Sequence, residues 1–233
     1  MKILVIDDEQ PTLTMFELLL STLGHEVLLA NSGERGLEVF AEHRPPLVLT
    51  DIKMPGMDGI EVLGRLKEEE PNVEVVVITG HGDMDVAIQA LNLDATDFIN
   101  KPLRLEVLEK ALERVEERIK LSTDKFVTLS TQFTDETMVI TVRGTLGTAD
   151  EAEIKHAFKG AGDAKRVVLD FTENTSINGA AIALLTDSIR TFYNDGGKVV
   201  ISGLSENFRN VFEIMGVTRF ATFVDKIQDI DAQ

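Results

Sequence analysis

The sequence of 233 residues predicts an α/β protein built from two domains. In the first half, short runs rich in β-branched residues alternate with stretches of helical periodicity, which is typical of a doubly wound parallel sheet. In the second half, two runs of alternating polar and apolar residues flank a polar turn and precede further strand and helix patterns. That order predicts a smaller α/β domain with a mixed sheet.

The first half contains five predicted strands, each followed by a predicted helix. This arrangement fits a five-stranded sheet of flavodoxin-like order, in which the first and third strands are neighbours. Functional sites in such sheets form at the carboxyl ends of the strands. The strands are KILVID, EVLLA, PLVLTD, VEVVVIT and TDFIN, and the first four helices span about 12–23, 33–43, 59–69 and 85–91.

The fifth predicted helix is unusually long, because it begins after Pro102 and continues to about Leu121. Its apolar residues recur at alternating spacings of three and four, which is a heptad pattern. Two interpretations stay open. In the first interpretation, the first turns of the helix pack on the domain and the rest is a solvated linker. In the second, residues 103–121 pair with a second copy in a homodimeric coiled coil. The pattern consists of Leu105, Leu108, Leu112, Val115 and Ile119.

A polar segment at residues 122–125 predicts the linker between domains at 1–121 and 126–233. The runs FVTLSTQF and MVITVRG then predict a hairpin around the turn TDET. The remaining pattern predicts alternating helices and strands. These are a helix at about 149–158, the strand RVVLDF, a helix at 180–193, the strand KVVISG, a helix at 206–215 and the strand ATFV.

Composition narrows the class of protein. The formal net charge is -17 and the isoelectric point is about 4.6, which argues against non-specific binding to nucleic acid or anionic membrane. Cysteine is absent, which excludes disulfides and thiol chemistry. The apolar runs are strand-sized, well below the roughly 20 residues of a spanning helix, and no signal peptide is expected. We therefore expect a cytoplasmic protein with no nucleic-acid or membrane partner.

Five polar residues stand at the ends of the predicted strands of the first half. Asp7 and Asp8 end the first strand, Asp51 the third and Thr79 the fourth, and Lys101 follows the fifth. Three carboxylates at one sheet edge suit Mg²⁺, and a hydroxyl and an ammonium beside them suit a phosphoryl group. One carboxylate can serve as the nucleophile. Any single residue is explained as an ordinary loop residue, but the five together predict a phosphoryl site.

The segments KILVIDDE, LVLTDIKMPGMDG, VVVITGHGD and DFINKP resemble the receiver domain of bacterial two-component response regulators, over residues 1–121. The resemblance implies that Asp51 is the phosphoacceptor for a histidine kinase. It implies that Mg²⁺ is held by Asp7, Asp8, Asp51 and the backbone carbonyl of Lys53. The resemblance implies no classical enzyme. At most, the domain would take a phosphoryl group from small donors and remove it again by autodephosphorylation.

Further residues gain expected roles from the same resemblance. Thr79 would turn toward the acyl phosphate, and Lys101 would pair with a phosphoryl oxygen. Phe98 stands where the family has its aromatic rotamer switch, although its pattern fits an ordinary core residue equally well. Asp94 departs from the glycine that is usual in the family, and we expect it to tolerate the left-handed turn.

The second half lacks a basic recognition helix, a glycine-rich nucleotide loop and metal-ligand spacing. Its segments MVITVRGTLGTADEAEI, RVVLDFTENTSINGAAIALL and GGKVVISGLSENFRNVFEIMGVTRF resemble a STAS domain, the fold of anti-sigma-factor antagonists, over about 126–230. In that family a serine before a helix is phosphorylated by a serine kinase that doubles as an anti-sigma factor. Here the loop reads Asn178-Gly179-Ala180, so the usual serine is absent.

The predicted partner-binding loop comprises Thr175, Ser176, Asn178, Gly179 and Ala180. Asn178 can cap the following helix, whereas glycine and alanine cannot accept a phosphate. The two upstream hydroxyls are either modification sites or ordinary turn residues. The loop is expected to be a contact surface, the alternative being a degenerate loop that binds nothing.

These features predict a response regulator in which phosphorylation of Asp51 switches the protein contacts of a STAS output domain. The expected partners are a histidine kinase and an anti-sigma or serine-kinase-like protein. A second hypothesis is a scaffold module that assembles with other STAS proteins. A third is an Asp-nucleophile phosphatase, which would need an aspartate where Lys53 stands.

Overall fold

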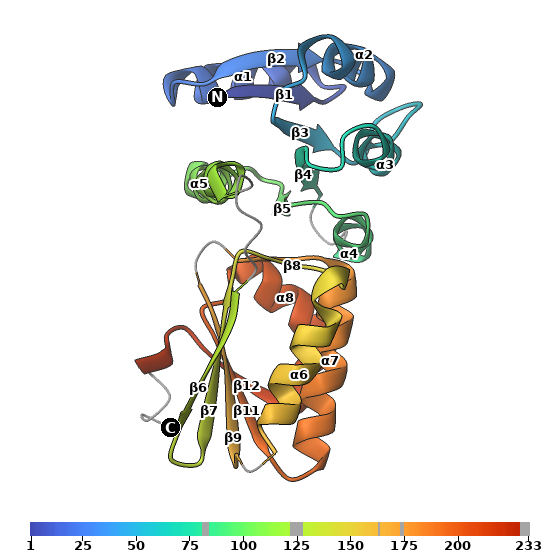
Figure 1. Ribbon diagram of the computed structural model, residues 1–233. Coiled ribbons are helices and arrows are strands. Elements are labelled where there is room, and N and C mark those ends of the chain that lie inside the picture. Colours follow the sequence, from blue (N-terminus) through green and yellow to red (C-terminus); the bar gives the residue numbers. More distant parts are fainter. Residues whose placement is uncertain (81–83, 122–127, 163, 173–174, 229–233) are drawn as a thin grey trace. The chain divides into compact units, whose positions relative to one another are not determined.

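The computed structural model describes residues 1–80, 84–121, 128–162, 164–172 and 175–228 (Figure 1). The chain divides into two compact units, Met1–Ile119 and Lys120–Gln233, which are described separately below. The predicted linker at 122–125 lies outside the described residues, so the exact domain boundaries stay a prediction.

The first unit contains a five-stranded sheet in the order β2-β1-β3-β4-β5. All its neighbouring strands are parallel, and β1 pairs with both β2 and β3. The predicted doubly wound topology is therefore confirmed. The strands are β1 (Lys2–Ile6), β2 (Glu26–Ala30), β3 (Leu47–Asp51), β4 (Glu74–Thr79) and β5 (Asp97–Asn100).

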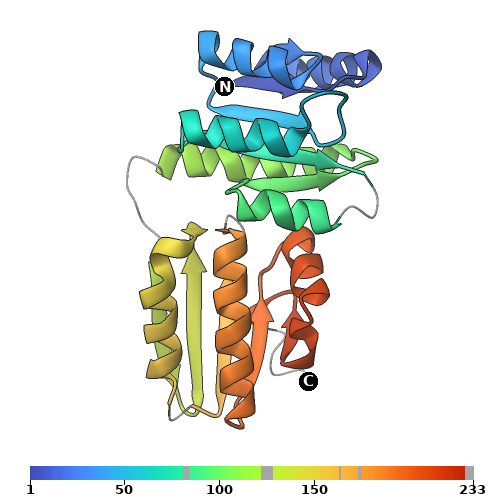
Figure 2. The ribbon, with the colours of Figure 1, turned by 90° about the vertical axis from the view of Figure 1, so that its right-hand side faces the viewer.

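Helices cover both faces of this sheet (Figures 1 and 2). Apolar residues of α1 and α5 share one core cluster with the sheet, while α3 and α4 lie on the opposite side from α5. The helices are α1 (Gln10–Thr22), α2 (Gly33–His43), α3 (Gly59–Glu69), α4 (Met84–Asn92) and α5 (Leu105–Leu121). Asp94, just after α4, has a φ of 61°, which confirms the predicted left-handed turn.

The two central strands of this sheet are buried along their whole length, because helices exclude water from both faces. Every residue of β3 and β4 is buried, which matches their near-continuous apolar sequence. Each fully buried Val, Leu or Ile side chain contributes about 1.5–3 kcal/mol to folding. This core holds the carboxyl ends of the strands in fixed relative positions.

The heptad pattern of α5 is largely buried within the first unit. Leu108 and Val115 are fully buried in the core cluster, Leu112 is 4% exposed, and Ile119 packs against the same cluster. Leu105 was predicted to belong to the seam, but it is 45% exposed and lies outside the cluster. The structure therefore favours packing of α5 on the sheet of the first unit over a coiled coil along these residues.

The second unit contains a mixed five-stranded sheet in the order β12-β11-β9-β7-β6. The antiparallel hairpin of β6 and β7 is confirmed, and the remaining pairs are parallel. The sheet strands are β6 (Thr128–Thr134), β7 (Thr137–Arg143), β9 (Arg166–Phe171), β11 (Lys198–Ser202) and β12 (Ala221–Val224).

Three α-helices lie side by side over one face of this sheet (Figures 1 and 2). They are α6 (Glu151–Gly160), α7 (Gly179–Asn194) and α8 (Glu206–Ile214), with short 3₁₀ turns η1 (Thr148–Asp150) and η2 (Val217–Arg219). A separate two-stranded sheet joins β8 (Thr145–Leu146) to β10 (Ser176–Ile177) and was not predicted. Two-residue strands leave no periodic pattern in a sequence.

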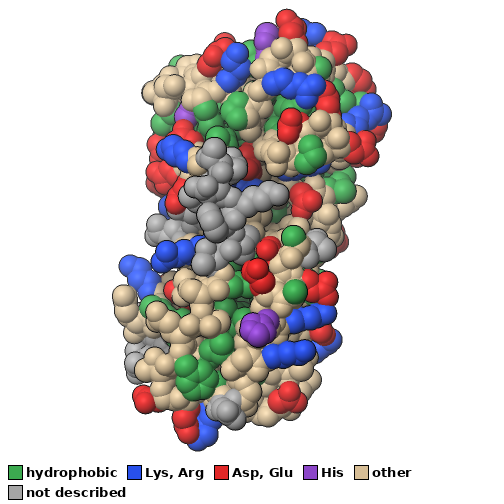
Figure 3. Space-filling view, viewed as in Figure 1, with side chains coloured by type: hydrophobic (Ala, Val, Ile, Leu, Met, Phe, Trp, Pro, Cys, Tyr) green, Lys and Arg blue, Asp and Glu red, His purple; other side chains and the backbone are tan. Residues whose placement is uncertain are grey.

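Acidic and basic side chains are interspersed over both units on the face shown in Figure 3. Among the described helices, none combines the length and the apolar character that crossing a membrane requires.

Candidate functional site

The parallel register places the predicted polar residues of the first unit at one edge of its sheet. Ile6 pairs with Thr50, so the residues that follow them, Asp7 and Asp51, leave adjacent strands together. Thr79 ends β4, opposite Asn100 of β5, and the next residue is Lys101. The backbone N–H of Lys101 donates to the carbonyl of Thr79 at 2.7 Å. The structure therefore brings these side chains to one end of the sheet.

Three carboxylates form a cluster at this edge. Oxygen atoms of Asp7, Asp8 and Asp51 lie within 4.8 Å of one another. Asp7 is fully buried and Asp51 is 5% exposed, whereas Asp8 faces solvent. Asp7 is held in place by the N–H of Glu9, which donates to Oδ1 at 2.8 Å. The cluster therefore has a fixed inner side and an open outer side.

Lys101 is the cation of this cluster. Its Nζ lies 3.1 Å from Oδ1 of Asp51 and 3.4 Å from Oδ2 of Asp7. Burial lowers the pKa of Lys101, but the charges of Asp51 and Asp7 outweigh it and leave the pKa above its ordinary value. Burial raises the pKa of Asp51, with Lys101 opposing the shift and Asp7 adding to it. The ammonium of Lys101 thus contacts two of the three clustered carboxylates.

The chemistry of this donor set fits Mg²⁺. Mg²⁺ prefers oxygen ligands, commonly one or two carboxylates with waters and phosphate oxygens, and Asp8 leaves an exposed side for them. A divalent cation would also offset the like charges of the cluster. Lys53, whose backbone carbonyl is the further predicted ligand, lies two residues beyond Asp51 with its side chain exposed.

Thr79 and Phe98 occupy the inner side of the same region. Thr79 is 1% exposed, and its hydroxyl donates to the carbonyl of Gly80 at 3.4 Å. Phe98 is fully buried on β5. Both residues are therefore packed in the core in this conformation.

Gly59 is a site residue that the sequence interpretation did not single out. A Cβ built on Gly59 would lie 2.1 Å from the carbonyl oxygen of Asp51, closer than any side chain tolerates. The N–H of Gly59 donates to the carbonyl of Ile52 at 2.9 Å, and Asp58 caps α3 through the N–H of Glu61 at 2.8 Å. Asp58 and Gly59 therefore hold the start of α3 against the strand end that carries Asp51.

The predicted loop of the second unit is more buried than expected. Thr175 and Ser176 are 6% and 5% exposed, and the Thr175 hydroxyl donates to the Val142 carbonyl at 2.9 Å. Ser176 lies in β10, which pairs with β8. This burial favours a structural role for the two hydroxyls over modification.

The start of α7 carries the remaining loop residues. Asn178 accepts from the N–H of Ala181 at 2.9 Å, which confirms the predicted helix cap. Gly179 is buried, while Asn178 and Ala180 are partly exposed. The accessible part of the predicted loop is therefore narrower than its sequence suggested.

Two family matches account for most of the chain. Residues 3–113 match the family described as Response regulator receiver domain. Residues 129–225 match the family described as Mlab, STAS domain.

Individual relatives agree with the first match. Sporulation initiation phosphotransferase F of Bacillus subtilis (strain 168) is 32% identical over 113 residues, which are 48% of this chain and 91% of that protein. The transcriptional regulatory protein FixJ of Rhizobium meliloti (strain 1021) is 36% identical over 115 residues, which are 49% of this chain and 56% of FixJ.

A solved receiver domain protein from Clostridium thermocellum is 40% identical, with a TM-score of 0.51, and the match covers 52% of this chain and 98% of that one. Several curated relatives are much longer than the match, since the chain spans 56% of FixJ and 27% of the regulatory protein ZraR of Klebsiella oxytoca.

The acidic strand-end cluster on a doubly wound sheet defines the class of the first unit. The chain belongs to the response regulator receiver family through residues 3–113 and carries a STAS domain at residues 129–225. Receiver domains of this family bind Mg²⁺ at an acidic pocket, and Asp7, Asp8 and Asp51 form such a cluster here.

Proposed function

We propose that this chain is a two-component response regulator in which a histidine kinase phosphorylates Asp51. The observation that carries the proposal is the contact of Asp51 with Lys101, 3.1 Å apart, inside a cluster of three carboxylates. A buried strand-end carboxylate next to a fixed ammonium is suited to accept a phosphoryl group, because the cation offsets charge on the incoming oxygens. The receiver family membership supports this assignment.

In the proposed reaction, a carboxylate oxygen of Asp51 attacks the phosphorus of the kinase's phosphohistidine. The new P–O bond forms as the P–N bond breaks, and the imidazole leaves. Lys101 pairs with a phosphoryl oxygen. Asp7, Asp8, Asp51 and the carbonyl of Lys53 would hold Mg²⁺, which supplies positive charge for the phosphoryl oxygens when bound.

Thr79 and Phe98 are proposed to report the phosphorylation to the surface. The Thr79 hydroxyl now donates to a neighbouring carbonyl and would exchange this weak contact for a phosphoryl oxygen. Phe98 is fully buried, so a change in its rotamer needs space that a displaced Thr79 would leave. Two packed arrangements of one core provide the two states that such a switch requires.

The STAS domain is proposed to be the output that binds a protein partner. Its partner-binding surface would include the start of α7, where Asn178 and Ala180 are partly exposed and small residues allow close approach. The partner class that fits the resemblance is an anti-sigma factor or serine-kinase-like protein. Because the loop lacks its usual serine, control is proposed to lie in Asp51.

Phosphoryl transfer is tested with acetyl phosphate and Mg²⁺, followed by intact-mass measurement and acid-stable separation of the products. The wild type is expected to gain one phosphoryl group, and Asp51→Asn is expected to gain none. Asp58→Asn is the matched control, because it removes a carboxylate from the segment between β3 and α3, and asparagine caps a helix as well as aspartate does. Equal phosphorylation of Asp51→Asn would contradict the proposal.

The output is tested by affinity capture with beryllofluoride-treated protein and with Asp51→Asn, followed by mass spectrometry. A captured partner is then titrated against both forms. Different affinities support the switch, and identical affinities contradict it. Sedimentation of the two forms without a partner tests the alternative hypothesis of a scaffold module. That hypothesis requires the two forms to differ in their state of assembly.

A further inference from the structure

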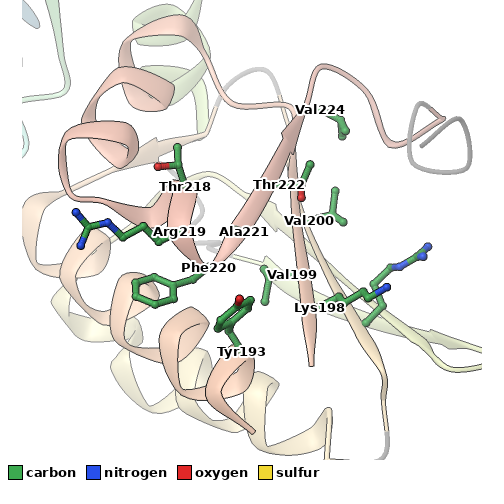
Figure 4. A pocket seen from close by; sticks show the side chains of 11 residues that line it. Tyr193, Lys198, Val199, Val200, Thr218, Arg219, Phe220, Ala221, Thr222 and Val224 are labelled. Carbon is green, nitrogen blue, oxygen red and sulfur yellow. The ribbon is translucent and has the colours of Figure 1, made fainter. Parts of the chain in front are cut away.

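The second unit contains a hollow of about 330 Å³ that the proposed function does not use (Figure 4). It lies at the amino ends of the parallel strands β9, β11 and β12, beside the end of α7. Its volume falls at the lower end of the range for small-molecule sites, about 300–1,000 Å³. The residues that line it and matter for its chemistry are Arg166, Tyr193, Lys198, Thr218, Arg219 and Phe220.

Three cationic residues line this hollow, which is unusual in a chain of net charge -17. Arg166 and Lys198 are register partners at the first positions of β9 and β11, so their side chains leave the same face of the sheet. Arg219 comes from η2, just before β12. Within the part of the chain that the structure describes, none of the three lies within 4.0 Å of a carboxylate oxygen.

Several other cations of the same unit, although not all of them, lie in ion pairs. Lys165 lies 2.5 Å from Glu136, although it is the immediate neighbour of Arg166. Lys155 and Arg190 are likewise paired with Glu151 and Asp187. The positive charge around the hollow is therefore not neutralised by its surroundings, and it is available to an anion.

An aromatic pair forms another part of the lining. The rings of Tyr193 and Phe220 stand edge to face with centroids 5.6 Å apart, and Tyr193 is 46% exposed. Figure 4 shows both rings on one side of β11, with Arg219 next to Phe220, and Lys198 on the other side of the strand. Arg219 thus lies on the side of the rings, and a molecule that contacts the rings reaches Lys198 and Arg166 around the amino end of β11.

The local sequence explains why these groups meet. After α7 ends, Gly196 turns the chain with a φ of 92°. A Cβ on Gly197 would lie 2.2 Å from the ring of Phe192, so only glycine fits there. The next residue, Lys198, is fixed by its N–H, which donates to the Lys165 carbonyl at 2.9 Å. The turn NDGGK thus places Lys198 beside Arg166 four residues after α7 ends at Asn194.

We propose that this hollow binds a small organic anion with an aromatic or similarly flat apolar group and a phosphate or carboxylate head. The flat group contacts the Tyr193–Phe220 pair, and the head lies toward the flanking cations. Guanidinium groups bind phosphate and carboxylate through paired hydrogen bonds, and Tyr193 and Thr218 add hydroxyl donors at the rim. The site is separate from the proposed phosphorylation of Asp51.

The test is an NMR titration of the full chain carrying Asp51→Asn, in the presence of EDTA. Under these conditions, phosphorylation and metal binding at the carboxylate cluster of the first unit cannot contribute to the observed shifts. Phenyl phosphate is the main probe. Inorganic phosphate and phenol represent its two halves, and benzoate distinguishes a carboxylate head from a phosphate head. We expect saturable shifts at the amides of Val199, Phe220 and Ala221, with phenyl phosphate binding at least about tenfold more tightly than either half.

Variants locate the site. Lys198→Gln is expected to weaken binding by about tenfold, the effect of losing one charged hydrogen bond. Lys165→Gln removes the same charge one residue before Arg166 and is expected to change nothing. Tyr193→Leu is expected to remove the advantage of phenyl phosphate over inorganic phosphate.

Three outcomes would overturn the proposal. They are no saturable binding of phenyl phosphate or benzoate up to about 10 mM, an equal loss in Lys165→Gln, and equal affinity for phenyl phosphate and inorganic phosphate. Circular dichroism of each variant confirms that it is folded.

Discussion

The Nζ atom of Lys101 lies 3.1 Å from Oδ1 of Asp51, although the two residues come from the ends of β5 and β3 with β4 between them. The long lysine side chain therefore crosses the end of the intervening strand. Asp7 and Asp8 bring two further carboxylates close to Asp51. Carboxylates this close repel one another, so we expect the stability of the first unit to depend on added cations.

We expect Mg²⁺ to raise the melting temperature of the chain, because a ligand that binds only the folded state stabilises it. The gain is about 2.7 kcal/mol at a concentration 100 times the dissociation constant. Asp7→Asn removes one of the predicted ligands and should abolish most of this gain. Thermal unfolding with and without MgCl₂ measures both, with Asp58→Asn as the control. An undiminished Mg²⁺ effect in Asp7→Asn would show that the cation binds elsewhere.

Gly59→Ala is expected to destabilise the first unit by about 1–3 kcal/mol, because the new methyl group overlaps the carbonyl of Asp51. It should also slow phosphorylation, since the strand end that carries the acceptor must move. Gly64→Ala, in the same helix, meets nothing within 4 Å and should stabilise by about 0.5–1 kcal/mol. Urea unfolding of the two variants compares them. A loss of the same size in both would refute the steric argument.

Lys67 is expected to make the stability of the first unit rise with pH in the alkaline range. Its Nζ donates to the Val73 carbonyl at 2.7 Å, and burial lowers its pKa, with Glu74 opposing the shift. The unfolded chain keeps this proton up to about pH 10.4. Between the lowered folded pKa and that value the unfolded state binds more protons, so unfolding becomes less favourable as pH rises.

The measurement is the urea midpoint at pH values from about 8 to 11. In Lys67→Met the part of the rise due to this lysine should disappear, whereas Lys159→Met, which replaces an exposed lysine, should keep it. A wild-type midpoint with the same pH slope as Lys67→Met would contradict the assignment.

Asn178→Ala is expected to destabilise the second unit by about 0.5–2 kcal/mol, because the N–H of Ala181 loses its acceptor at the start of α7. Asn178→Asp keeps an oxygen in the same place and should be nearly neutral. The two variants are compared by hydrogen exchange of the first turn of α7. If both protect that turn equally well, the cap does not hold the loop.

Much of the fold and of the receiver site was predictable, because parallel topology leaves few choices. Once β1 and β3 are neighbours, the residues after them must meet, and Asp7 and Asp51 do so. The flanking helices were predicted because their apolar periodicity and caps are local properties of the sequence, as the cap at Asn178 shows.

Other features depend on contacts between distant residues, which no local pattern encodes. The heptad spacing of α5 is the same whether a leucine meets a second helix or its own sheet, and only burial distinguishes Leu108 from Leu105. The clamp at Gly59 and the hollow beside Lys198 likewise arise from elements that approach in space. The short pairing of β8 with β10 buries Ser176, which the sequence left as either a modification site or an ordinary turn residue.

The burial of the apolar side of α5 also limits how a signal can leave the first unit. Leu108, Leu112 and Val115 hold this helix to its own sheet. If α5 paired with a second copy along that side, the sheet beneath the helix would become exposed to water. Each large apolar side chain exposed in this way would cost about 1.5–3 kcal/mol. A signal carried by rotation or sliding of two paired α5 helices, in contact through these side chains, is therefore disfavoured. Under the proposed phosphorylation of Asp51, the signal would therefore leave the first unit through surfaces other than the buried side of α5.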